Sequence, residues 1–83
     1  MPDTDTRELD VRELPPPEKH PTIFDWFEDL EVGDSFVIIN DHDPVPLKYQ
    51  FQNERPGEMG WEYLEDGPEV WRVEIERVAE PQQ

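Results

Sequence analysis

The chain has 83 residues, with 22 Asp and Glu against seven Lys and Arg, and its formal net charge is −15. This length accommodates one small domain, and the charge disfavours unaided binding of nucleic acids or anionic lipids. The absence of cysteine excludes disulfides, thiolate metal sites, iron–sulfur clusters and cysteine nucleophiles. The sequence has no long apolar run, and its N-terminus lacks the basic segment followed by an apolar segment that is typical of signal peptides. We therefore expect no membrane span, no signal peptide and a cytoplasmic protein.

The acidic residues are spread along the whole chain rather than gathered in one acidic tail, and Lys19 and Lys48 are the only lysines. Such a surface keeps a protein soluble when salt screens charge repulsion. We therefore interpret the chain as a folded protein of a salt-adapted cytosol. The alternative is a mesophilic protein that docks on a basic partner.

The first predicted element is a strand at residues 9–14, where apolar and polar residues alternate after a polar tail at 1–6. The three prolines at 15–17 end this strand, because proline cannot donate to a β-ladder. A loop is then expected to run to His20.

The next segment, residues 22–30, has the apolar spacing of an amphipathic helix. Ile23, Phe27 and Leu30 fall on one face. Pro21 suits the first helical position, and Gly33 suits a left-handed cap after the helix.

A continuous apolar run at residues 35–40 predicts a strand that is covered or central in its sheet. The turn-rich residues 40–46 follow. There, Asp43 before Pro44 looks like a helix cap, and a second helix carrying Leu47 and Phe51 is predicted to end before Pro56.

Two alternating segments, at residues 61–64 and 70–77, predict a hairpin, since Asp66-Gly67-Pro68 between them has turn chemistry. Residues 79–83 are expected to form a tail, and residues 7–78 one domain. The resulting order, β-α-β-α-β-β, predicts an α+β two-layer sandwich with two helices on one face of a four-stranded mixed sheet.

Five segments carry a resemblance to a known family. They are residues 9–12 (Leu-Asp-Val-Arg), 15–18 (Pro-Pro-Pro-Glu), 36–44 (Phe-Val-Ile-Ile-Asn-Asp-His-Asp-Pro), 61–63 (Trp-Glu-Tyr) and 67–73 (Gly-Pro-Glu-Val-Trp-Arg-Val). In this order they resemble the domain of unknown function 2249 family. The resemblance implies a TusA-like, or SirA-like, fold and an association with hemerythrin-type proteins and nitrogen-oxide respiration.

The resemblance also marks a difference. TusA-like sulfur carriers place a catalytic cysteine, in a Cys-Pro motif, at the start of the first helix. The comparable stretch here is Pro-Pro-Pro-Glu at 15–18, and the chain contains no cysteine. Sulfur transfer is therefore not carried over, and we expect no enzyme activity.

One edge of the predicted sheet concentrates unusual residues. In a parallel β-α-β unit the loops that follow both strands emerge at the same edge, where ligands of α/β proteins commonly bind. This would bring residues 15–20 close to residues 40–47, with the N-termini of both helices. The edge holds both histidines of the chain, His20 and His42.

Two kinds of small ligand are considered for this edge. His20 and His42, with Asp41 or Asp43, would suit iron, zinc, manganese or a haem. The favoured alternative is that these residues form a turn and a helix cap. An anion held by Lys19, Arg12 and the helix ends is a further hypothesis.

A protein partner is the preferred ligand of this edge. The expected contact residues are Pro16, Pro17, Glu18, Asn40, Asp41, His42 and Pro46. Acidic neighbours elsewhere, such as Glu28 with Asp29 and Glu65 with Asp66, are attributed to chance in so acidic a chain.

Four aromatic residues, Trp26, Trp61, Tyr63 and Trp71, are expected to pack in the core or on the sheet rather than to stack a flat ligand. Trp26 is the exception, since it leans away from the apolar stripe of its helix. An exposed Trp26 would indicate a partner surface.

The sequence thus predicts a small acidic accessory or binding module without sulfur-transfer chemistry and with no cofactor. We expect it to be a monomer or weak homodimer that acts through a protein partner, in redox or nitrogen-oxide metabolism. The alternative is a small metal- or haem-binding redox protein that uses His20 and His42.

Overall fold

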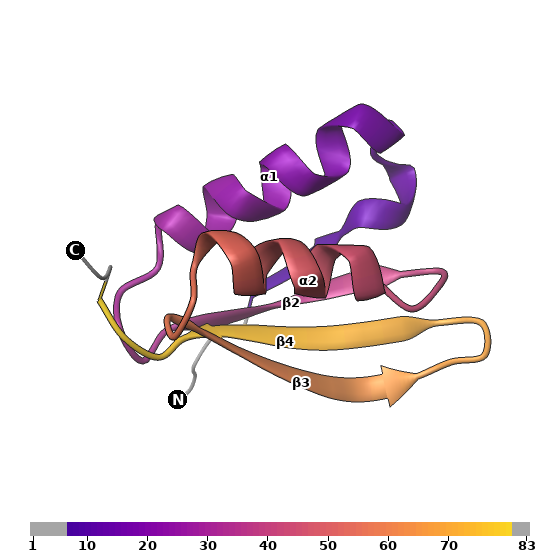
Figure 1. The fold of residues 1–83 in the computed structure, drawn as a ribbon. Helices are drawn as coiled ribbons and strands as arrows, with labels where there is room; N and C mark the ends of the chain where they lie inside the picture. The colour runs from indigo at the N-terminus through magenta and orange to yellow at the C-terminus, as the bar shows by residue number, and fades with distance from the viewer. Residues whose placement is uncertain (1–6, 81–83) are drawn as a thin grey trace.

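The computed structural model describes residues 7–80 (Figure 1), so the predicted tail at 1–6 and residues 81–83 lie outside the described residues. The elements follow the predicted order, with a short 3-10 helix after the first strand. They are β1 (Arg7–Asp10), η1 (Val11–Glu13), α1 (Pro16–Glu28), β2 (Ser35–Asn40), α2 (Val45–Glu54), β3 (Met59–Asp66) and β4 (Trp71–Arg77).

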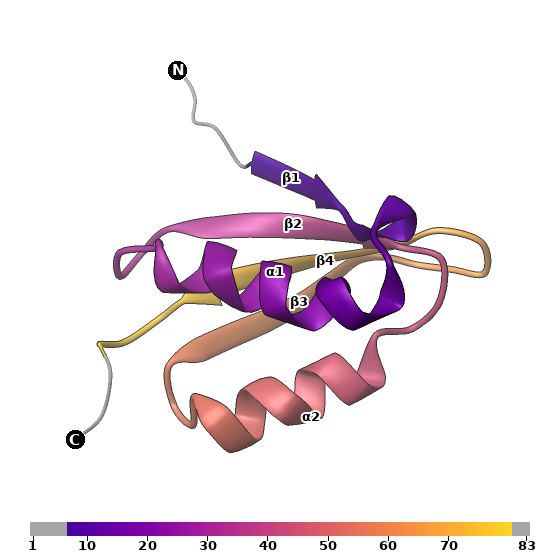
Figure 2. The same ribbon diagram turned by 90° about the horizontal axis from the view of Figure 1, so that it is seen from above.

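The sheet has the strand order β1-β2-β4-β3. β1 and β2 are parallel, and β4 runs antiparallel to both β2 and β3. Both helices lie on one face of this mixed sheet (Figure 1). Seen from above, α1 lies over the middle of the sheet, α2 lies beside it, and β1 forms the opposite edge (Figure 2). The predicted two-layer α+β fold is confirmed.

The core fills the space between the helices and the sheet. Strand alternation turns Phe36 and Ile38 of β2 and Val73 and Ile75 of β4 toward the helices. Five further residues complete the buried cluster: Val11, Ile23, Phe27, Leu47 and Phe51. The apolar stripe predicted for the first helix is confirmed, because Ile23 and Phe27 are buried and Leu30 packs against the cluster.

The other face of the sheet carries no helix of the described chain, and side chains cover it instead. Arg72 of β4 forms an ion pair with Glu8 of β1, although β2 separates the two strands. Its side chain must therefore cross β2, where Val37 is only 2% exposed. Beside this pair, the Ser35 hydroxyl donates to Glu74 at 2.8 Å.

The predicted strand at 9–14 is wrong beyond Asp10. The Asp10 carboxylate accepts a hydrogen bond from the Arg12 backbone amide at 3.0 Å, and Arg12 also donates to it through its guanidinium. Such a short-range bond offers the backbone an alternative to the ladder. The chain turns into η1, which still buries Val11.

The predicted start of the first helix is also wrong. α1 begins at Pro16, so Pro16 and Pro17 form its first turn rather than a stop, and His20 and Pro21 lie within the helix. Proline is tolerated in the first turn because the N–H groups there have no helical partner. Gly33 has the predicted positive φ, but in the turn before β2 and not at the end of the helix.

The second helix starts one residue later than predicted, at Val45, and its cap position is Pro44, without a side-chain hydrogen bond. Asp43 therefore does not cap the helix. Its carboxylate accepts a hydrogen bond from the Tyr63 hydroxyl at 2.7 Å. The hairpin is confirmed. β3 is longer than the predicted segment at residues 61–64, and Gly67 in the turn has a positive φ.

Candidate functional site

The edge predicted from topology contains a small pocket, here called the histidine pocket, with a volume of about 60 Å³. It lies where β1 and β2 end and both helices begin. Its apolar lining comes from Val11, Ile23, Leu47, Pro44 and Pro46. Its polar lining comes from Lys19, His20, Asn40 and His42. Both histidines therefore lie in one pocket, as expected from the parallel β-α-β unit, whose loops emerge at the same edge of the sheet.

Three of the predicted partner-contact residues, Asn40, His42 and Pro46, line this pocket. The others, Pro16, Pro17, Glu18 and Asp41, are exposed but do not line it. Asn40 is buried, and its side-chain oxygen accepts a hydrogen bond from the Asp41 backbone amide at 2.9 Å. Asn40 therefore shapes the turn that carries His42.

The tautomer of His20 follows from a chain of hydrogen bonds on α2. The Gln50 amide nitrogen donates to the Glu54 carboxylate at 3.0 Å. The Gln50 oxygen lies 2.6 Å from Nδ1 of His20 and can only accept. Nδ1 of His20 must then carry a proton, and a neutral His20 keeps its lone pair on Nε2.

His42 has the same arrangement. Its Nδ1 lies 2.8 Å from Oδ1 of Asp41, and both side chains are largely exposed. A carboxylate accepts, so Nδ1 donates and Nε2 of the neutral ring holds the lone pair. The hydrogen bond from His42 lowers the pKa of the Asp41 carboxyl, with a smaller contribution from Lys19.

The four residues considered for a metal site do not form a ligand group. A histidine whose Nδ1 donates to an acceptor is typical of metal ligands, but Asp41 is engaged by His42, and Asp43 by Tyr63. Among residues 7–80, no three His, Cys, Asp or Glu side chains come together as a group that could hold a metal ion.

Burial, and then the hydrogen bond to Asp43, raises the pKa of Tyr63.

The residues considered for anion capture are also divided. Arg12 does not line the histidine pocket, because its guanidinium bonds the Asp10 carboxylate at 2.9 and 2.7 Å. This pair lowers the pKa of Asp10 to about 2 and raises the pKa of Arg12. Lys19 alone supplies a permanent positive charge to the lining.

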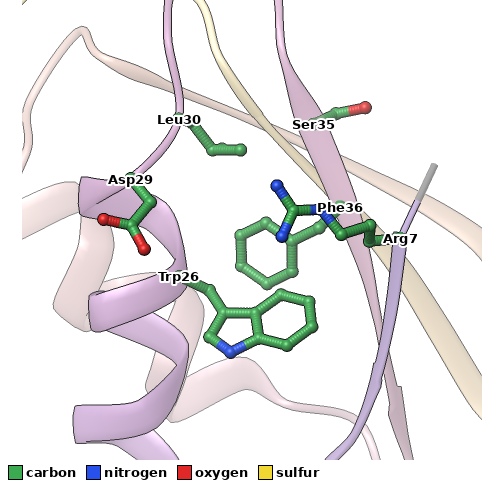
Figure 3. A pocket seen from close by; sticks show the side chains of 6 residues that line it. All are labelled: Arg7, Trp26, Asp29, Leu30, Ser35 and Phe36. Atoms are coloured by element: carbon green, nitrogen blue, oxygen red, sulfur yellow. The ribbon is translucent and has the colours of Figure 1, made fainter. Parts of the chain in front are cut away.

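A second hollow lies at the other end of β1 and β2, with a volume of about 160 Å³, and is here called the tryptophan pocket (Figure 3). It is lined by Arg7, Trp26, Asp29, Leu30, Ser35 and Phe36. Sequence patterns did not indicate this site, because its residues come from the end of α1 and the starts of two strands.

The aromatic residues pack as expected. Trp26 is half-buried, with its ring 5.5 Å from that of Phe36, so it is not the exposed side chain that would have marked a partner surface. Trp61, Tyr63 and Trp71 form a row of edge-to-face contacts at 6.1 and 6.2 Å.

The acidic neighbours do not form paired sites. Glu28 bonds Arg55, whereas Asp29 is one of the residues that line the tryptophan pocket. Glu65 and Asp66 are exposed at the end of β3.

Comparisons with known proteins gave one match. A family model described as "Uncharacterized conserved protein (DUF2249)" matches residues 8–77. Neither the curated proteins nor the solved structures yielded a match. No helix within residues 7–80 is long and apolar enough to cross a membrane.

Proposed function

Because the chain belongs to the family of uncharacterised conserved proteins DUF2249, whose description assigns no activity, we propose that it is a small binding module. The module engages a protein partner through the histidine pocket and the exposed residues around it. The observation that carries this proposal is the pocket itself, which combines an apolar floor with two imidazoles at the predicted edge.

The dimensions of the pocket indicate what it would receive. A volume of about 60 Å³ admits one small side chain. Val11, Ile23 and Leu47 favour a short aliphatic group. With Nε2 of His20 and His42 available as acceptors, a partner segment that carries hydrogen-bond donors beside this aliphatic group fits best.

Proline makes this surface suitable for docking. Pro16 and Pro17 open α1, and Pro44 and Pro46 flank the start of α2. Proline loses almost no side-chain entropy when it is buried, and its ring restricts the backbone before binding. A surface that is preorganised in this way loses less free energy on association.

The wider setting is also part of the proposal. The element order supports the TusA-like fold that the resemblance implies, while Pro-Pro-Pro-Glu at 15–18 leaves no thiol for sulfur transfer. The distributed charge of −15 supports a salt-adapted cytoplasmic protein. The association with nitrogen-oxide respiration that the resemblance implies makes a redox protein the first partner to seek.

Affinity capture at high salt tests the module directly. The bait is the full chain or its His42→Ala/Pro46→Ala variant, and the control is Tyr49→Ala, which changes an exposed residue of α2 outside the pocket. We expect one partner to be retained by the wild type and the control and to bind the double variant at least about tenfold more weakly. Equal retention by the double variant contradicts the proposed surface.

Metal binding is a second candidate, favoured by one observation: both imidazoles of the histidine pocket keep Nε2 unprotonated when neutral. Calorimetric titration with Zn²⁺, Mn²⁺ or Fe²⁺ should then give a heat of binding with the wild type that is absent from a His20→Gln/His42→Gln variant. The visible spectrum of protein purified without a histidine tag tests for haem. Equal, weak heats from both proteins and a colourless sample contradict this candidate.

A further inference from the structure

The tryptophan pocket places two opposite charges across an apolar hollow. Arg7 enters from β1 with its guanidinium turned toward the hollow, and Asp29 lies across from it at the rim, directly after the end of α1 (Figure 3). Trp26, Leu30 and Phe36 form the apolar walls. No ion pair joins these two described residues, so the pocket keeps a cationic side and an anionic side.

Asp29 is exposed, and its carboxylate has no partner within the described part of the chain. It occupies the C-terminal cap of α1, where the helix dipole disfavours a negative charge. Its neighbour Glu28 is neutralised by Arg55, but no hydrogen bond or ion pair joins the Asp29 side chain to another of the described residues 7–80. A cationic group from a ligand would supply what the protein does not.

Arg7 is held differently. Its guanidinium carbon lies 5.9 Å from the centroid of the Trp26 ring, a distance at which a cation–π contact stabilises the charge over the ring. This contact orients the guanidinium toward the hollow while leaving its donors able to bind a carboxylate. The Trp26 ring is itself steadied by Phe36.

The size and charge of the pocket limit the class of ligand that can bind in it. Its volume of about 160 Å³ is close to that of a cavity of about 150 Å³ that accepts one benzene molecule. A ligand with both charges has no net charge, so the field of a protein with net charge −15 neither repels nor concentrates it. A simple anion would face that repulsion.

We propose that the tryptophan pocket binds a free α-amino acid with a short apolar side chain. The ligand carboxylate bonds Arg7, the ligand ammonium bonds Asp29, and the side chain lies against Trp26 and its apolar neighbours. This site is separate from the histidine pocket, since the two lie at opposite ends of β1 and β2. It can therefore be right or wrong independently of the proposed partner surface.

The test uses the full chain, with L-leucine as the probe and the indole N–H resonance of Trp26 as the readout. N-acetyl-L-leucine lacks the ammonium, and L-leucinamide lacks the carboxylate. We expect the Trp26 indole resonance to shift until it saturates as L-leucine is added. Each derivative should bind at least about tenfold more weakly, since each loses one charged hydrogen bond.

Variants assign the two ends of the ligand. Asp29→Asn should weaken L-leucine binding by about 10- to 100-fold and leave the weak binding of N-acetyl-L-leucine unchanged. Asp25→Asn, an exposed change on α1 outside the pocket, is the matched control and should bind as the wild type does.

Three results would overturn the proposal. The first is no saturable shift at Trp26 with L-leucine, and the second is equal binding of L-leucine and either derivative. The third is an equal loss of affinity in Asp29→Asn and Asp25→Asn.

Discussion

Replacement of Arg77 by methionine should strongly destabilise the protein, although Arg77 lines neither the histidine pocket nor the tryptophan pocket. Its side chain is charged yet only about 4% of the residue is exposed. The guanidinium lies 4.5 Å from the ring centroid of Phe27, and it donates to the Phe27 carbonyl, at the end of α1, at 3.2 Å. It also lies 3.8 Å from carboxylate oxygens of Glu28 and Glu58.

The expected cost follows from these contacts. A desolvated cation–π contact is worth about 2 kcal/mol, and a hydrogen bond from a charged donor about 1.5–3 kcal/mol. Removing Arg77 also takes one cation away from the buried Glu58 carboxylate, and breaking a buried ion pair typically costs about 3–5 kcal/mol in total. Because both carboxylate distances are long, we expect the lower limit, about 3 kcal/mol. Methionine retains most of the aliphatic volume, so little of this is a cavity effect.

Such a loss is large for a chain of this length. At about 0.05–0.15 kcal/mol per residue, 83 residues give a free energy of unfolding of about 4–12 kcal/mol. A loss of about 3 kcal/mol should lower the melting temperature by about 12–24 °C.

Denaturant unfolding at fixed salt, followed by circular dichroism and tryptophan fluorescence, measures the effect. Arg72→Met is the matched control, since Arg72 lies on the same strand but its ion pair with Glu8 is partly exposed and should cost less than about 1 kcal/mol. The Arg77→Met/Glu58→Gln double variant should be more stable than the sum of the single changes predicts. Equal costs at the two arginines, or strict additivity, would refute the reasoning.

Three further predictions concern single side chains. Tyr63→Phe removes the hydroxyl that donates to Asp43 and should cost about 1 kcal/mol in unfolding experiments; in the wild type, ultraviolet titration should find one tyrosine ionising above the usual range. The lowered pKa of Asp10 contributes stability that is complete above its ordinary value of 3.8 and lost as the pH falls to about 2, so Asp10→Asn should remove this part of the acid profile. Gly67→Ala should cost about 1–3 kcal/mol by thermal unfolding, since the residue has a φ of 85° and its Cβ would lie 2.6 Å from the Trp71 ring; an unchanged melting temperature would contradict this strain.

Periodicity predicted the elements whose side chains alternate or repeat clearly. The alternating residues 71–77 formed a strand, as did the continuous apolar run at 35–40, and Ile23 with Phe27 formed the buried stripe of α1. The prediction failed where a local contact competed with the pattern. The strand ended at Asp10, where the side-chain carboxylate accepts a hydrogen bond from the Arg12 backbone amide. Pro16, which was expected to end a strand, instead begins α1.

The histidine pocket was predictable in part. The right-handed β-α-β crossover brings the ends of β1 and β2 together whatever their side chains, so His20 and His42 could be placed at one edge from the chain order. The partners that fix their tautomers could not all be placed in this way. Gln50 lies on α2, thirty residues from His20, and the only sequence signal was its i,i+4 spacing to Glu54.

The sequence by itself determined the two-layer fold, the family and the absence of thiol chemistry, because these depend on composition and on periodic order along the chain. Only the tertiary structure decided which charges meet. It buried Arg77 against Phe27 and set Arg7 opposite Asp29 across the tryptophan pocket. In a chain with 22 acids and seven bases, every base has many possible acidic partners, and the energy of each pair depends on distance and burial. Both quantities exist only once distant segments have packed together.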